Sequence, residues 1–150
     1  MSKINARDWV FEASADPSAA TPVWAEIGGV NSFTLSNSEG EESTETTTFA
    51  SAGVAESQAM QRGASLSVEG FIERDGAGAS DAGQDVVDTL AAQVGEASLG
   101  GVRFRHVDET DWTVWTAWVS KGDNGGGNND KTSWSATFTR SGAATVTAVV

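Results

Sequence analysis

Residues 131–140 read Lys-Thr-Ser-Trp-Ser-Ala-Thr-Phe-Thr-Arg, and their order is the clearest structural signal in the chain. The apolar side chains of Trp134, Ala136 and Phe138 alternate with serines and threonines. A period of two places apolar side chains on one face of a β-strand and hydroxyl side chains on the other. This stretch is therefore predicted to be a strand with one buried face and one polar face.

Residues 62–74 repeat the pattern. Ala64, Leu66, Val68 and Ile72 are expected to point inward, with Phe71 as an apolar exception on the outward side. Further strands are predicted at residues 7–14, with Trp9, Phe11 and Ala13 on one face, at 99–107, with Val102 and Phe104, at 111–121, and at 145–150, which is a last strand or a tail.

Residues 23–37 predict one long strand or two short ones, with Gly28-Gly29 as a bend or bulge. Residues 81–94 carry the one helical pattern. Asp81 is expected to cap it, with Gln84 completing a capping box and Gly95 ending it. The apolar stripe expected to face the sheet is Val86, Val87, Leu90, Ala91 and Val94.

The composition agrees with one β-rich domain. Hydrophobic residues make up 39% of the 150, enough for a modest core, and no apolar run approaches the ~20 residues of a membrane span. The first residues lack the apolar stretch of a signal peptide, so we expect a soluble protein made in a cytoplasm. The net charge of -12 either maintains solubility or lets something anionic pass without binding.

The residue inventory argues against an enzyme. Cysteine and tyrosine are absent and His106 is the one histidine, so thiolate chemistry and most acid–base and metal chemistry lack their usual residues. His106 and Asp108 suggest a serine-hydrolase triad, but no GxSxG elbow occurs and an ordinary strand-end histidine is favoured. No catalytic, cofactor-binding or metal-binding residue is therefore predicted.

Three other motifs have both a functional and a structural interpretation. Residues 123–130 superficially resemble a calcium loop but lack the closing glutamate, which favours a hairpin tip. The glycines of residues 75–83 precede a helix, where phosphate can bind, but acidic residues surround them. Trp112, Trp115 and Trp118 suggest a sugar-stacking platform, yet a strand apolar on both faces favours a core or subunit interface.

The segment from Glu39 to Met60 is different in kind. Four glutamates lead into Thr46-Thr47-Thr48-Phe49, and neither a helical nor a strand period runs through it. Connectors of this length are usually functional or disordered.

The order of these parts resembles the major tail tube protein of long-tailed (siphovirus-like) bacteriophages. The matching features are Trp24-Ala25-Glu26-Ile27-Gly28-Gly29-Val30, the acidic and threonine-rich Glu41 to Phe49, Ser65-Leu66-Ser67-Val68-Glu69-Gly70, a single helix, and the serine/threonine strand running to Ser141-Gly142. The doubled glycine departs from the single glycine that is commoner in that family.

The resemblance implies a mainly β fold of two packed antiparallel sheets, a β-sandwich or half-barrel, flanked by one α-helix. It implies one domain over residues 1–150, with a long assembly loop at about 39–60 and extended termini. Six subunits would form a ring around a channel, and rings would stack head to tail. The ring-stacking loop would include Thr46, Thr47, Thr48, Phe49, Val54 and Met60, and the lumen would be lined by Ser65, Ser67, Glu69, Glu73, Ser133, Ser135 and Thr137.

Further expectations follow from the same resemblance. The protein would be a structural part of the virion tail, assembled in the host bacterial cytoplasm, with no cofactor and no membrane contact. Its partners would be other copies of itself, a tape measure protein, a tail terminator and distal tail or baseplate proteins, and DNA would pass without specific binding. The alternatives are a soluble β-sandwich that binds carbohydrate or protein, and a tube subunit of a gene transfer agent or phage-tail-like particle.

Overall fold

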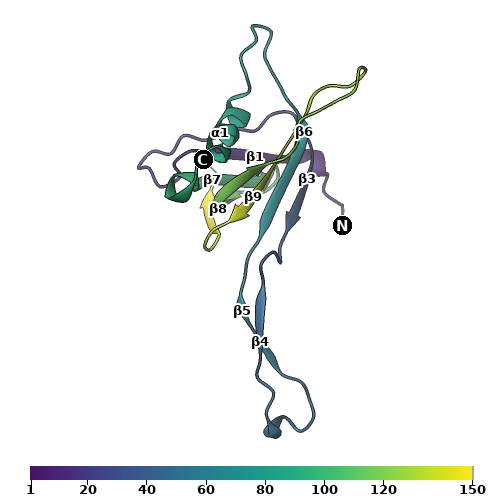
Figure 1. Ribbon diagram of the computed structural model, residues 1–150, viewed down its shortest axis with the longest axis vertical. Helices are drawn as coiled ribbons and strands as arrows, with labels where there is room; N and C mark the ends of the chain where they lie inside the picture. Colours follow the sequence, from purple (N-terminus) through teal and green to yellow (C-terminus); the bar gives the residue numbers. More distant parts are fainter. Residues whose placement is uncertain (150) are drawn as a thin grey trace.

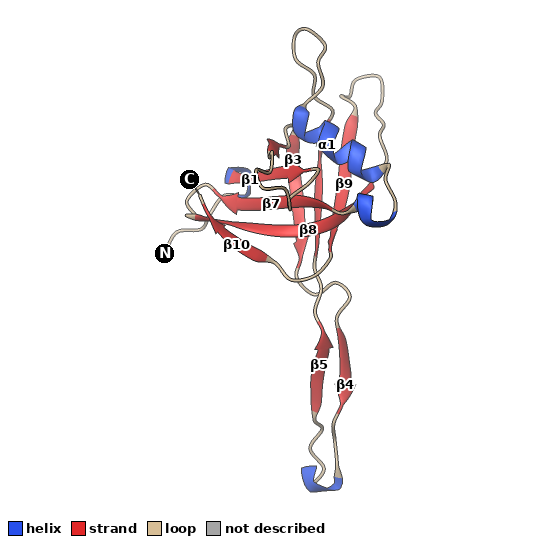
Figure 2. Cartoon of the chain, turned by 90° about the vertical axis from the view of Figure 1, so that its left-hand side faces the viewer, coloured by secondary structure: helices blue, strands red, loops and turns tan. Residues whose placement is uncertain are grey.

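The computed structural model describes residues 1–149 (Figures 1 and 2). Its elements are three short 3-10 helices, η1 (Ala6–Asp8), η2 (Phe49–Ser51) and η3 (Gly95–Ser98), one α-helix, α1 (Ala82–Ala91), and ten strands, β1 (Trp9–Ser14), β2 (Ala25–Glu26), β3 (Val30–Ser36), β4 (Glu42–Glu45), β5 (Ser57–Gln61), β6 (Ser65–Phe71), β7 (Gly100–His106), β8 (Asp111–Lys121), β9 (Ser133–Arg140) and β10 (Thr145–Ala148). The predicted last segment ends in Val150, which lies outside the described residues.

One curled antiparallel sheet forms the body of the molecule. Its strand order is β2-β1-β7-β8-β9-β6-β3, with β10 beside β8. Strand β8 joins two layers, because its residues Thr113–Ala117 pair with β7 while Ala117–Lys121 pair with β9. The layers face each other, and the rings of Phe11 on β1 and Phe33 on β3 lie 5.1 Å apart. The predicted mainly β fold with two packed layers and one helix is confirmed.

The core lies between the two layers. Leu66 and Val68 of β6 are buried beside Ala136 and Phe138 of β9, as the alternation predicted. The predicted inward position of Ile72 is wrong. Strand β6 ends at Phe71, so Ile72 follows the last residue held in the sheet register and is exposed.

Helix α1 packs against β1, β2 and β8, and Val87 and Leu90 are buried. The carboxylate of Asp81 accepts the backbone N–H of Gln84 at 3.0 Å, as expected of the cap. The stripe is shorter than predicted, because the helix ends at Ala91 and leaves Val94 exposed in the following loop. No helix in residues 1–149 is long and apolar enough to cross a membrane.

The pair Gly28-Gly29 turns the chain from one layer to the other, since β2 pairs with β1 and β3 pairs with β6. Gly29 has a φ of 73°, which favours glycine, and a side chain there would clash with the carbonyl of Phe71. Of the two predictions for residues 23–37, two short strands with a bend is the right one.

The side chain of Gln84 locks this bend to the helix. Its Nε2 donates to the carbonyl oxygens of Gly28 and Phe71, both at 2.9 Å. Its Oε1 accepts the backbone N–H of Glu73 at 3.3 Å. The side chain therefore bonds to distant backbone and not to the cap residue, so the capping-box role predicted for Gln84 is wrong.

A hairpin made of β4 and β5 projects from the body (Figures 1 and 2). We call residues 37–62 the arm. Every residue of β4 and β5 is exposed, and no residue of the arm is buried. The segment without a sequence period is therefore an extended hairpin that contributes nothing to the core.

Candidate functional site

The outward side of the layer β3-β6-β9-β8 is lined by hydroxyl groups, and we call it the polar face. Directly paired residues share a face, so the pairings place Thr34, Ser67, Thr137 and Ser120 in one row across four strands. The hydroxyl oxygens of Ser67 and Thr137 lie 3.1 Å apart. The polar residues of this face are Ser32, Thr34, Ser36, Ser65, Ser67, Glu69, Ser120, Ser133, Ser135, Thr137 and Thr139. Two exposed aromatic residues share the face, because Phe71 pairs with Ser133 and Trp118 pairs with Thr139.

Most of the predicted lumen residues meet on this face: Ser65, Ser67, Glu69, Ser133, Ser135 and Thr137. Among the residues of the set, Glu69 carries the one charge, and its carboxylate accepts the Ser32 hydroxyl at 3.3 Å. Lys121 at the end of β8 points to the other side, where it pairs with Asp88 of α1 at 3.1 Å. The face is therefore hydroxyl-rich with a single carboxylate, and most of the chain's negative charge lies elsewhere.

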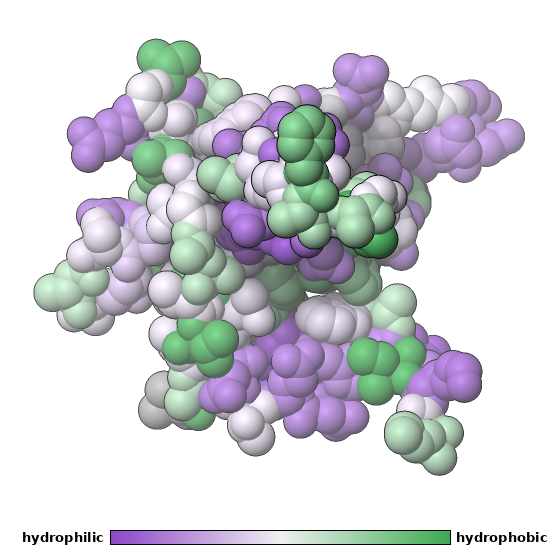
Figure 3. All heavy atoms as spheres, turned by 90° about the horizontal axis from the view of Figure 1, so that it is seen from below, coloured by the Kyte–Doolittle hydropathy of each residue, from purple (hydrophilic) through white to green (hydrophobic). Residues whose placement is uncertain are grey.

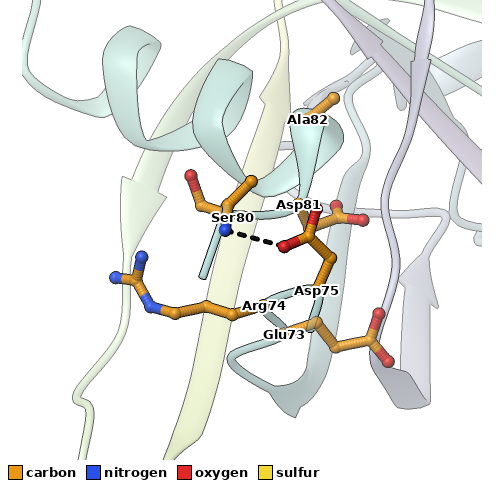
Figure 4. A pocket seen from close by; sticks show the side chains of 7 residues that line it. Glu73, Arg74, Asp75, Ser80, Asp81 and Ala82 are labelled. Carbon is orange, nitrogen blue, oxygen red and sulfur yellow. Dashed lines mark hydrogen bonds between the residues drawn. The ribbon is translucent and has the colours of Figure 1, made fainter. Parts of the chain in front are cut away.

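Glu73 is the predicted lumen residue that does not join the polar face. It follows the end of β6 and lines a hollow with Asp75 and Asp81 at the start of α1 (Figure 4). The side chains of Glu73 and Arg74 point in opposite directions there. Asp81 accepts the N–H of Gly28 and that of Gln84, so the protein's own carboxylate holds the position that the sequence offered to a phosphate.

The layer that carries the polar face has two open edges. Strand β3 pairs with β6 on one side and with no strand on its other side within residues 1–149. On β8, the segment Trp118–Lys121 pairs with β9 but continues past the end of its pairing with β7. Open edges present unpaired backbone N–H and C=O groups to another chain.

The three tryptophans of β8 do not form a platform. Trp115 is buried in the core, and Trp112 is covered by the guanidinium groups of Arg103 and Arg105, whose carbons lie 4.3 and 5.0 Å from its ring centroid. Trp118 is 45% exposed at the open edge of β8. The prediction of a strand covered on both faces is right for Trp112 and Trp115 and wrong for Trp118, because Trp118 pairs with Thr139 and lies on the uncovered polar face.

Sequence reasoning missed the cluster around Arg103. Its guanidinium lies between the rings of Trp24 and Trp112 and pairs with Glu12 at 2.6 Å. These residues are far apart in the chain, so no local pattern reveals the contact. The cluster ties the loop before β2 to the outer side of β7.

His106 is buried at the end of β7. Its Nδ1 accepts the backbone N–H of Asp108 at 3.2 Å, and its ring packs edge-on against Trp9. Within residues 1–149 its Nε2 has no hydrogen-bond partner, so no serine hydroxyl is held there. In the 123–130 loop, Asp130 accepts the N–H of Gly127, and residues 1–149 contain no group of three His, Asp or Glu placed to hold a metal ion.

The arm carries all the predicted stacking residues. At its tip, η2 is held by the bond from Thr48 N–H to Ser51 Oγ, at 3.1 Å, and by the bond from Ser51 Oγ to Glu56, at 2.8 Å. Phe49 is the first residue of η2 and Val54 follows the turn, and the two are 106% and 67% exposed. Figure 3 looks up the arm from below, and hydrophobic atoms gather at its near end. Thr46 and Thr47 precede the tip, and Met60 is an exposed residue of β5.

Comparison with protein-family models gave no match, and comparison with curated proteins gave none either. Solved structures gave matches. A chain of the tail of an empty gene transfer agent particle with C6 symmetry is similar over 97% of this chain and 100% of its own length, with a TM-score of 0.71 and 16% identity. A chain of the virion of a native gene transfer agent particle has the same coverage, a TM-score of 0.69 and 16% identity.

A third similar chain comes from the six-fold symmetrised baseplate of the anti-feeding prophage. It covers 99% of this chain and 97% of its own, with a TM-score of 0.59 and 11% identity. At these identities the likeness establishes a shared fold. The fold of this chain is thus one that also occurs in the tails and baseplates of phage-like particles.

Proposed function

We propose that this chain is a structural subunit of a phage-like tail tube, in which copies join edge to edge into closed rings and the rings stack into a hollow tube. The observation that carries the proposal is the polar face, a four-stranded layer with two open edges. Ring closure would pair both edges and remove the exposed backbone that invites aggregation.

The strand directions favour such a ring. Strands β3, β6, β9 and β8 alternate in direction, so β3 and β8 run opposite ways. Rotation about a ring axis leaves each strand direction unchanged relative to that axis. The β8 edge of one copy would therefore meet the β3 edge of the next in antiparallel orientation, and the layers would form one continuous barrel. The six-fold symmetry of the similar particles favours six copies.

The arm suits the contact between rings. It continues from β3 and β6 away from the body, and none of its residues is buried in the subunit's own core (Figure 2). A contact along the ring axis repeats without closing and gives a filament. We propose that the chain is one tube domain, that residues 39–60 act as its stacking loop, and that the termini add contacts to neighbouring copies.

The polar face would line the channel. In a ring of six, Glu69 would contribute one carboxylate per subunit at a single level, among rows of hydroxyls. Like charge repels phosphate and hydroxyls hold water, so DNA would slide through without specific binding. The role is structural and not enzymatic, located in a virion tail and assembled in the host bacterial cytoplasm.

The tube would meet a tape measure protein inside, a tail terminator at one end and distal tail or baseplate proteins at the other. We propose a siphovirus-like phage as the source, because the features of this sequence follow one another in the order that is typical of siphovirus tail tube proteins. The fold likeness to two gene transfer agent chains favours a gene transfer agent as the second candidate.

Negative-stain electron microscopy of the concentrated pure protein tests the proposal. The expected result is hollow tubes of uniform width whose end views show six-fold symmetry. Protein that stays monomeric, both alone and when added to short preformed tail fragments, contradicts it.

A further inference from the structure

A hollow between β1 and β3 has a chemistry unlike the rest of the acidic surface. Trp9, Phe11, Val30 and Phe33 provide apolar walls, and Arg7 lies at its rim. Its volume is about 220 Å³, below the roughly 300–1,000 Å³ of small-molecule pockets. We call it the Arg7 hollow; its size suits one or two inserted side chains.

The arm and the Arg7 hollow lie at opposite ends of the same strand. The hollow is lined by Val30 to Phe33 at the start of β3, whereas the arm continues from Ser36 at the end of β3. In a head-to-tail stack, the arm of one copy points toward the hollow-bearing end of the next. The arm and the hollow therefore lie at the two ends of the subunit that face each other in a head-to-tail stack.

The charges of the two surfaces are complementary. The arm carries five glutamates and one arginine, Arg62, which pairs with Glu41 at its base. Arg7 is exposed, and within residues 1–149 no carboxylate lies in ion-pair range of it. Other hollows on the body are lined by carboxylates, such as those beside Asp75 and beside Asp123, and they would repel the arm.

The tip of the arm offers a matching apolar group. Phe49 is fully exposed on a turn that the bonds among Thr48, Ser51 and Glu56 hold in place. A fixed turn loses less conformational entropy on binding than a mobile loop does. An exposed aromatic side chain on such a turn is typical of an interface anchor.

We propose that the Arg7 hollow is the docking site for the arm tip of a second copy of this chain, with Phe49 inside the hollow and arm glutamates beside Arg7. This inference rests on the proposed stacking of rings and names the surface that receives the arm. Binding would cover the apolar walls of the hollow together with the exposed side chains at the tip.

Disulfide trapping tests the contact directly, because the chain contains no cysteine. The variant Val54→Cys/Ala6→Cys has one thiol at the tip and one in the Arg7 hollow, and oxidation under assembly conditions should give a ladder of covalent multimers. The matched control, Val54→Cys/Ser18→Cys, has its second thiol in a different hollow and should stay monomeric on denaturing gels. Tubes without a ladder overturn the docking site and leave the tube function standing, whereas neither tubes nor ladder overturns both.

A third pair, Met60→Cys/Ala6→Cys, checks which part of the arm is bound. A ladder from this pair alone overturns the placement of the tip. Charge reversal gives an independent readout: Arg7→Glu should abolish sedimentable tubes, and adding Glu45→Arg should restore them. The control Arg74→Glu, in the hollow at the start of α1, should assemble normally. Tubes formed by Arg7→Glu alone contradict the role of Arg7.

Discussion

Phe138 and Phe49 are the same residue type in two regions that fold by different means. Phe138 is 1% exposed in the body, between two layers of strands, whereas Phe49 is 106% exposed at the tip of the arm. The body buries its apolar side chains, and the arm is held by backbone pairing, one ion pair and a few hydroxyl bonds. An isolated two-stranded hairpin is marginally stable in water. The buried core of the body therefore carries the stability of the fold, while the arm adds little to it.

The variants Phe138→Ala and Phe49→Ala should show the largest difference between the body and the arm. Removing the Phe138 ring leaves a core cavity and should lower the free energy of unfolding by about 3–5 kcal/mol. Removing the Phe49 ring exposes nothing new and should change it by less than about 0.5 kcal/mol, yet weaken tube assembly. Urea unfolding measures the first effect and sedimentation the second. Equal destabilisation by both variants would show that the arm is part of the folded core.

Gln84→Ala gives the next largest effect. The change leaves the part-buried carbonyl oxygens of Gly28 and Phe71 without their donor, and a total loss of about 1–3 kcal/mol in the free energy of unfolding is expected. Gln93→Ala, just after the same helix, removes an exposed amide and should have almost no effect. Thermal unfolding of the two variants compares them. Identical melting temperatures would mean that the bend at Gly28-Gly29 does not depend on the helix.

The sequence predicts the body better than the arm, because a strand with one buried face alternates apolar and polar residues. The alternation in residues 131–140 predicted a strand with the correct inward face, since its neighbours cover one side along its whole length. Ile72 and Val94 were misplaced because each lies beyond the end of a strand or helix, and periodicity does not mark such ends. Trp118 was misplaced because it stays paired with β9 but faces the uncovered side of that layer. The arm has no buried face, so its strands carry no period at all.

The candidate site was predictable to the same extent. Six of the seven expected lumen residues share one face because strand alternation sorts them. Glu73 misses it because the chain leaves the sheet after Phe71. The role of Gln84 depends on partners 56 and 13 residues away, and the Arg7 hollow joins two strands that are distant in sequence. Contacts of that kind follow from topology and not from local pattern.

Arg62→Ala loosens the base of the arm alone. The Arg62–Glu41 ion pair is partly exposed, and such pairs contribute about 0.2–1 kcal/mol. Amide hydrogen exchange should speed up in β4 and β5 while exchange in β6 and β9 stays unchanged. Lys131→Ala removes an exposed cation from another hairpin and serves as the control. Faster exchange throughout the body would contradict the separation of the two regions.

Glu69→Lys changes the polar face without touching the core. Because Glu69 is an exposed strand residue, the substitution should change the free energy of unfolding by less than about 0.5 kcal/mol. The one local change is the loss of the hydrogen bond from Ser32. Tubes should form, but a ring of cations facing the channel would hold DNA, so release from loaded particles should slow at low salt and recover at high salt. Glu73→Lys, away from the face, is the matched control. Unchanged release by Glu69→Lys argues against this face lining the channel.

Replacing residues 44–58 with Asn-Gly should have the smallest effect on folding of all. The new two-residue turn joins Ser43 and Ala59, which are paired in the hairpin, and Asn-Gly suits such a turn. No buried side chain is removed, so urea unfolding should match the parent within about 0.5 kcal/mol. Assembly should be lost altogether. A subunit that folds as well as its parent and never stacks would assign the arm wholly to contacts between copies, whereas normal tubes would leave stacking to the body surfaces.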